Sequence, residues 1–135
     1  MSKSAFSLRV FSIYMFALGT VLVIAPNILL AIFGVPETHE VWIRIVGMLV
    51  LFLGYVDFMA SRNELLYFFR WSVPIRLSVP VFFIVFIALG FAPPILLLFG
   101  AIDAAAALWT VACLRADGLA QPSVQAGRRK KRGAP

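Results

Sequence analysis

The sequence predicts an all-α integral membrane protein, a bundle of four transmembrane helices with both termini on the cytoplasmic side. Apolar residues make up 62% of the 135-residue chain and charged residues 13%, whereas soluble domains have about 45–50% and about 25%. A soluble fold of this length has too little interior to hide so much apolar surface. The apolar residues fall in four long runs, and Lys and Arg gather between alternate runs. Lipid is therefore the expected solvent for most of the chain.

Four segments are long enough to cross the hydrocarbon core, which needs roughly 20 helical residues. The first has no charge, and Pro26 near its end is either tolerated or kinks the helix. Thr38 is expected to cap the second, and Pro93 and Pro94 to open the fourth. Arg76, early in the third, is expected to snorkel to the interface. The predicted spans are about 10–33, 41–60, 71–90 and 94–114, within a transmembrane domain over 1–115.

The basic residues predict the orientation, because cytoplasmic segments carry an excess of Lys and Arg. They occur in the N-terminal segment, in the connection between the second and third spans, and after the fourth span. Arg44 is the exception on the outer side, and Glu40 precedes it by four residues, a favourable helical pairing. We therefore expect a multi-pass protein of the cell inner (plasma) membrane.

The C-terminal tail, residues 116–135, has no helical periodicity and is predicted to be disordered on the cytoplasmic side. A basic run in this tail is expected to contact anionic lipid headgroups, so the predicted partners include the bilayer itself. We do not expect nucleic acid as a partner for a tail tethered to a membrane. The run consists of Arg128, Arg129, Lys130, Lys131 and Arg132.

The connection from Ser61 to Trp71 supports two interpretations. Ser61 and Glu64 have the spacing of a capping box, and an aromatic stretch follows them. These residues either form a short interfacial helix between the second and third spans, or are an ordinary aromatic belt at the ends of those spans.

Charged side chains inside the spans predict an intramembrane polar site made of Asp103, Asp57, Arg44 and Arg76. A charge at the bilayer centre costs about 2.5–3.5 kcal/mol, so such groups face the bundle and find partners. Asp57 is expected to pair with Arg62 or Arg76. Asp103, near mid-span, is either a neutral or paired structural group, or an acid that binds a proton or a ligand.

Small residues on the inward faces predict close helix packing, because they let two backbones approach. The two aspartates each end a Gly-x-x-Asp string, at 54–57 and 100–103, and the segments around these strings are alike either by duplication or by chance. The residues expected to pack helices are Gly47, Gly54, Gly100 and Ala107.

The chain has one cysteine, Cys113, and one histidine, His39, which excludes an intrachain disulfide, a CxxC site and a haem held by two histidines. No Ser/His/Asp set, phosphate-binding loop or metal-ligand cluster occurs. We therefore predict no catalytic residue, no metal and no cofactor.

Several short strings carry a resemblance to a known family: Pro26-Asn27, Trp42-x-Arg44-x-x-Gly47, Gly54-x-x-Asp57, Arg76, and the stretch from Gly100-x-x-Asp103 to Trp109-Thr110. With them, residues 8–115 resemble the small four-helix bacterial inner-membrane proteins grouped as DoxX-like. The resemblance implies the four-helix fold. It also implies a link to quinone-dependent oxidoreductases, of which some DoxX-type proteins look like subunits, although no residue here matches a known catalytic position.

The leading functional expectation is a non-enzymatic membrane protein, either an accessory subunit with a membrane-protein partner or a homo-oligomer. Two alternatives stay open: a small proton-coupled transporter that uses Asp103, and a subunit of a quinone-linked membrane oxidoreductase.

Overall fold

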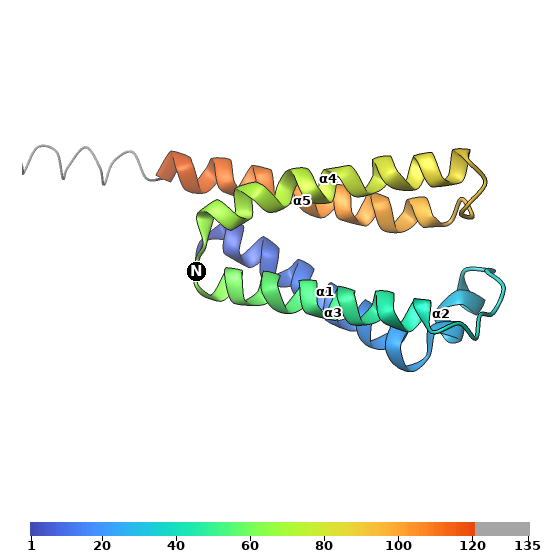
Figure 1. The fold of residues 1–135 in the computed structure, drawn as a ribbon. Helices are drawn as coiled ribbons and strands as arrows, with labels where there is room; N and C mark the ends of the chain where they lie inside the picture. The colour runs from blue at the N-terminus through green and yellow to red at the C-terminus, as the bar shows by residue number, and fades with distance from the viewer. Residues whose placement is uncertain (121–135) are drawn as a thin grey trace, which may run out of the picture.

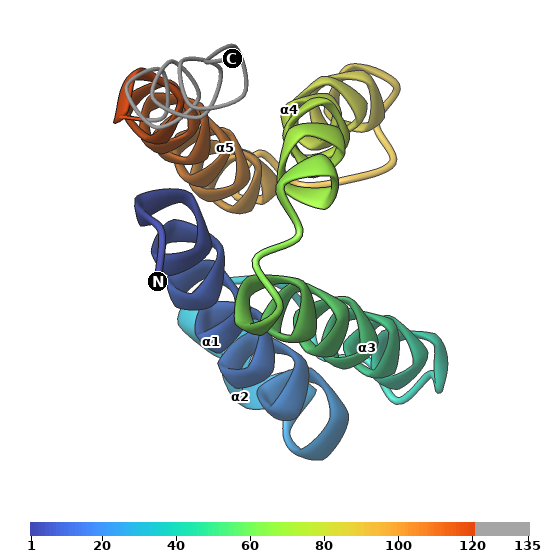
Figure 2. The same ribbon diagram turned by 90° about the vertical axis from the view of Figure 1, so that its left-hand side faces the viewer.

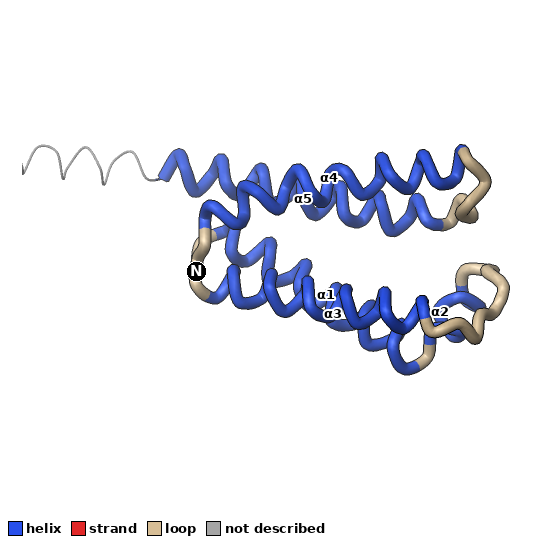
Figure 3. The backbone as a smooth tube through the Cα atoms, in the orientation of Figure 1, coloured by secondary structure: helices blue, strands red, loops and turns tan. Residues whose placement is uncertain are grey.

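The computed structural model describes residues 1–120, which form five helices joined by loops and contain no strand. Four of the helices, α1, α3, α4 and α5, are long and apolar enough to cross a membrane, which confirms the predicted number of spanning segments (Figures 1 and 3). The basic run from Arg128 to Arg132 lies outside the described residues. The helices are α1 (Lys3–Ile24), α2 (Pro26–Ile32), α3 (Trp42–Arg62), α4 (Leu66–Ala88) and α5 (Leu96–Ala120).

The first apolar run forms two helices instead of one. Helix α1 begins earlier than expected because the Ser2 hydroxyl caps it, accepting a hydrogen bond from the Ala5 N–H at 3.1 Å. It ends at Ile24, and Ala25 leaves the helical region with φ −140° and ψ 61°. Pro26 has no N–H to continue the ladder but suits a first helical turn, so it opens the short α2. Pro26 was predicted to be tolerated or to kink one helix, whereas the structure has two separate helices at this point.

Thr38 does not cap the second span, so that prediction was wrong. Helix α3 begins four residues later, at Trp42, with Val41 as its N-cap and no side-chain cap. Thr38 instead stabilises the loop before α3. Its N–H donates to Asn27 Oδ1 at 3.0 Å, and its hydroxyl accepts from the Glu40 N–H at 3.3 Å.

No separate interfacial helix forms between Ser61 and Trp71. Helix α3 continues to Arg62, and α4 begins at Leu66 after a turn of three residues. The expected capping box is absent there because the Ser61 hydroxyl donates to the Phe58 carbonyl at 2.7 Å and Glu64 adopts a positive φ of 52°. The aromatic stretch therefore belongs to the start of α4, which begins five residues before its predicted start.

The four long helices pack as two antiparallel pairs. Helix α1 lies along α3, and α4 lies along α5, while α1 also contacts α5 and so joins the pairs (Figures 1 and 2). Across residues 1–120, α3 makes no comparable contact with α4 or α5. A small apolar core lies where the pairs meet, at the end that holds the N-terminus. It consists of Ala5, Leu8, Ala60 and Phe69.

Small residues lie where the helices of each pair approach most closely. A Cβ atom on Gly47 would lie 2.7 Å from the Leu22 Cβ and 2.9 Å from the Val23 nitrogen, so only glycine fits between α3 and α1. Gly54 also faces α1. Gly100 faces Pro80 of α4, with a distance of 3.0 Å from its added Cβ to the Pro80 Cα. These glycines pack helices within one chain.

We expect Gly47→Ala to destabilise the fold by about 1–3 kcal/mol, because the added methyl group meets backbone atoms of α1 and forces the two helices apart. Gly118→Ala on α5 is the matched control, since nothing lies within 4 Å of its added Cβ. Unfolding in detergent, followed by circular dichroism, measures both. Equal stability of the two variants would contradict this account of the α1–α3 contact.

Candidate functional site

Arg76 is buried inside the protein and does not snorkel, so that prediction was wrong. Its side chain is only 5% exposed. The reason is the early start of α4. Arg76 lies ten residues after Leu66, roughly 15 Å along the helix, which is too far from the helix end for its side chain to leave the bundle.

The Arg76 guanidinium is held by an aromatic ring and two hydroxyl groups. Its Cζ lies 4.6 Å from the centroid of the Phe11 ring, a cation–π contact. Its Nη2 donates to Ser72 Oγ at 3.2 Å and to Thr110 Oγ1 at 3.1 Å. Phe11 belongs to α1 and Thr110 to α5, so one side chain of α4 connects three helices.

A chain of buried hydroxyl groups continues from Arg76 into α1. Thr110 Oγ1 lies 3.1 Å from Ser7 Oγ, and the Ser7 hydroxyl also donates to the Ser4 carbonyl at 2.8 Å. Ser4 and Thr110 are fully buried and Ser7 almost so. Sequence reasoning missed Ser4 and Ser7. The available signal was helical spacing, since Ser4, Ser7 and Phe11 recur at intervals of three and four residues and share one face of α1.

Asp57 and Asp103 reach the same region from different helices. Asp57 on α3 is 8% exposed, and Asp103 on α5 is partly buried. The charges of both carboxyl groups act on Arg76, and Tyr14 of α1 lies close enough to interact with Asp103. Asp57 was expected to pair with Arg62 or Arg76, but among residues 1–120 it forms an ion pair with neither. Arg62 is exposed at the end of α3.

Neither carboxyl group bonds directly to Arg76. The ion pair found among residues 1–120 joins the Met1 amine to Glu64, at 3.7 Å. The Nε and Nη1 atoms of Arg76 are buried and have no hydrogen-bond partner. Arg76, Asp57 and Asp103, here called the Arg76 cluster, lie within electrostatic range of one another, and Asp103 is only partly buried. The polar site predicted from the four residues therefore stays a prediction.

Arg44, the remaining residue of the predicted polar site, lies at the start of α3, away from the Arg76 cluster, and bonds to other groups. Its Nη1 donates to the Val23 carbonyl and, at 3.3 Å, to the Ile24 carbonyl. An unbroken helix would satisfy these carbonyls with N–H groups of the next turn, but the break at Ala25 removes those partners. Arg44 therefore caps the C-terminal end of α1.

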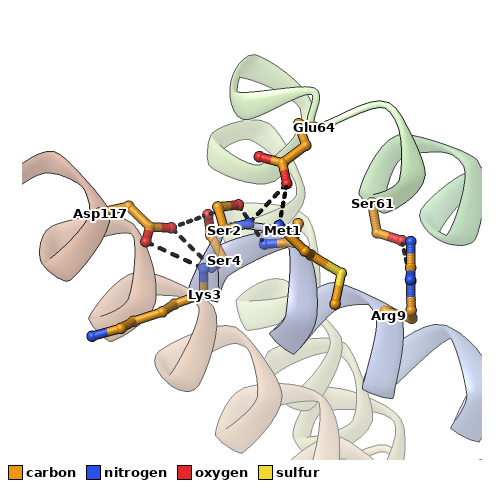
Figure 4. A network of polar contacts seen from close by, with 9 residues as sticks. Met1, Ser2, Lys3, Ser4, Arg9, Ser61, Glu64 and Asp117 are labelled. Carbon is orange, nitrogen blue, oxygen red and sulfur yellow. Dashed lines mark hydrogen bonds and ion pairs between the residues drawn. The ribbon is translucent and has the colours of Figure 1, made fainter. Parts of the chain in front are cut away.

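Two carboxylates fasten the first turn of α1 to the rest of the protein (Figure 4). Asp117 accepts from the Lys3 N–H at 3.2 Å, from the Ser4 N–H at 2.9 Å and from the Ser4 hydroxyl at 2.5 Å. Glu64 accepts from the Ser2 N–H at 2.8 Å. Negative charge is favourable at a helix N-terminus. Asp117 was missed because α5 was expected to end at 114, whereas it continues to Ala120.

We expect Arg44→Met to destabilise the protein by about 1–3 kcal/mol, because the α1 carbonyls lose their donor. Arg62→Met is the matched control, since it removes the same charge from an exposed helix end. Detergent unfolding monitored by circular dichroism compares the two. Similar losses in both variants would argue against a capping role for Arg44.

Comparison of the chain with models of protein families, with curated proteins and with solved structures found no match. The resemblance to DoxX-like proteins therefore stays a prediction, and the function has to be argued from the geometry of this chain alone.

Proposed function

We propose that the chain is a multi-pass protein of the cell inner membrane, with both termini in the cytoplasm. The arrangement of the helices supports this orientation. The start of α1, the turn between α3 and α4, and the end of α5 lie at one end of the molecule (Figure 1). These segments carry five of the seven basic residues in the described part of the chain, and cytoplasmic ends of transmembrane helices are rich in such residues. The residues are Lys3, Arg9, Arg62, Arg70 and Arg115.

Reporter fusions at the N-terminus, after residue 38 and at the C-terminus test this orientation. A reporter active only in the cytoplasm is expected to work at both termini, and one active only outside is expected to work after residue 38. An external C-terminus would overturn the proposed topology.

We further propose that the protein is a non-enzymatic subunit of a larger membrane assembly. The observation that carries this proposal is the partial exposure of Asp103, about two turns after the start of α5. A carboxylate that faces hydrocarbon costs about 2.5–3.5 kcal/mol, so it has to be covered. Helix α3 does not close over α4 and α5 in the described part of the chain. A neighbouring chain, either a second copy or a different membrane protein, supplies the missing cover.

The hydrogen bonds of the surrounding polar groups support a structural role for them rather than a catalytic one. The hydroxyl groups of Ser72 and Thr110 bond to helix carbonyls and to Arg76, and the Ser7 hydroxyl bonds to Thr110 and to a carbonyl of α1. Such groups are engaged in holding helices together, as buried hydroxyls between membrane helices generally are.

Photocross-linking in the native membrane tests for the neighbouring chain. A photoreactive residue in place of Ala106, one turn after Asp103 and partly buried, is expected to give one adduct of defined mass. The same residue in place of Leu108, which is 60% exposed, is the matched control and is expected to react mainly with lipid. The adduct mass distinguishes a second copy from a different protein.

Equal yields at positions 106 and 108, or the absence of any protein adduct at 106, would contradict the assembly. Proton-dependent flux by the isolated protein in liposomes would also contradict it, and would favour a small proton-coupled transporter.

A further inference from the structure

A groove lies on the outside of the bundle, where the start of α1 meets α5. Its volume is about 390 Å³. Phe6 of α1 and Trp109 of α5 form part of its wall, with their rings packed edge to face and the ring centroids 6.2 Å apart. The assembly proposed above makes no use of this groove. The residues that line it are Met1, Ser2, Lys3, Phe6, Trp109 and Cys113.

The lining of the groove changes from polar to apolar along the helix axes. Lys3 is the first residue of α1, and Phe6 lies three residues further into the helix, about 4.5 Å along its axis. Trp109 also lies deeper than Lys3, because it is next to Thr110, whose hydroxyl is 3.1 Å from that of Ser7. A phospholipid in a bilayer has the same order, with its charged headgroup at the surface and its apolar chains inside.

The Lys3 ammonium supplies positive charge at the polar end of the groove. Asp117 lies nearby, but its carboxylate accepts hydrogen bonds from the Lys3 and Ser4 backbone N–H groups and from the Ser4 hydroxyl. Among residues 1–120 the Lys3 ammonium forms no ion pair, and its side chain extends away from these contacts (Figure 4). Lysine is a common binding partner of phosphate, as a point charge.

The apolar wall favours a lipid over a water-soluble anion. Phe6 is 50% exposed and Trp109 is 42% exposed, so both rings present apolar surface that a small anion would leave uncovered. Tryptophan is typical of the membrane interface, where one part of the ring is apolar and the other is wet. Basic pockets between transmembrane helices bind anionic lipid headgroups. An acyl chain that follows such a headgroup would cover both rings.

We propose that this groove binds one anionic phospholipid, with its phosphate paired to the Lys3 ammonium and one acyl chain lying over Phe6 and Trp109. The proposal requires that the protein spans a membrane, and it holds for either orientation. The site is distinct from the basic run Arg128 to Arg132, whose expected attraction for anionic lipid needs no groove. It is also distinct from the surface that the proposed assembly covers, because Asp103 lies six residues before Trp109, about 9 Å away along α5.

Quenching of tryptophan fluorescence by brominated lipids tests the site in the full-length protein. The double variant Trp42→Phe/Trp71→Phe keeps Trp109 as its one tryptophan. It is reconstituted in bilayers of phosphatidylcholine and phosphatidylglycerol, with bromine on the acyl chains of one lipid or the other. Phosphatidylglycerol, the anionic lipid, is expected to be enriched about fivefold beside Trp109 relative to its fraction in the bilayer, the effect expected of one lysine near the surface.

The matched control is Trp42→Phe/Trp109→Phe, which keeps Trp71. This tryptophan is 70% exposed near the start of α4, at the same end of the molecule, and does not line the groove. Its quenching is expected to show little preference between the two lipids. In the variant that keeps Trp109, Lys3→Gln is expected to remove the preference. Arg62→Gln, which removes one positive charge from an exposed helix end, is expected to retain it.

Circular dichroism verifies that each variant is folded. If a tryptophan variant does not fold, native mass spectrometry of the chain with its natural tryptophans makes the same comparison. One phosphatidylglycerol is then expected to stay bound to the wild-type protein and to Arg62→Gln, and to be lost from Lys3→Gln.

An equal preference for phosphatidylglycerol at Trp109 and Trp71 would overturn the site, because the basic end of the protein would then attract anionic lipid as a whole. The absence of a preference at Trp109, its persistence in Lys3→Gln, or its loss in Arg62→Gln would also overturn it. None of these results bears on the proposed assembly, which the cross-link at position 106 tests separately.

Discussion

The burial of one guanidinium determines how the two helix pairs of this protein meet. Arg76 on α4 lies over Phe11 of α1 and donates to Thr110 of α5, so it contacts both pairs at once. A guanidinium away from water has to find acceptors within the protein. Hydroxyl groups supply part of this need, and Asp57 and Asp103 are the nearest acidic groups. The polar interior therefore gathers around one side chain.

The helix count follows from the apolar runs, because a run of about 20 apolar residues has one stable form in a bilayer. The helix ends were harder to predict, since they depend on local hydrogen bonds. Ser2 extends α1 towards the N-terminus through a bond to the Ala5 N–H. Asn27 Oδ1 accepts a hydrogen bond from the Thr38 N–H, and Thr38 is the residue that was expected to cap α3. Such pairings follow from the path of the chain and are not visible in hydropathy.

The burial of Asp57 could be predicted from helical spacing relative to the nearby glycines, whereas Asp103 is only partly buried. The position of Arg76 could not be predicted, because its depth depends on where α4 begins. A start at 71 puts it close to the helix end, whereas the start at Leu66 puts it inside the bundle. The separation of Arg44 from the cluster also has a local cause, since the break before Pro26 leaves carbonyls that need a donor. Hydropathy alone does not distinguish Arg44 from Arg76.

The first turn of α1 has a further consequence for how the chain acquires its structure. The backbone N–H groups of Lys3 and Ser4 bond to Asp117, which lies more than a hundred residues later in the sequence. A ribosome makes the chain from its N-terminus, so this acceptor does not exist while the earlier helices enter the membrane. The N–H groups of Lys3 and Ser4 therefore gain this acceptor only after α5 has been made. The first residues to be synthesised are thus among the last to complete their hydrogen bonds.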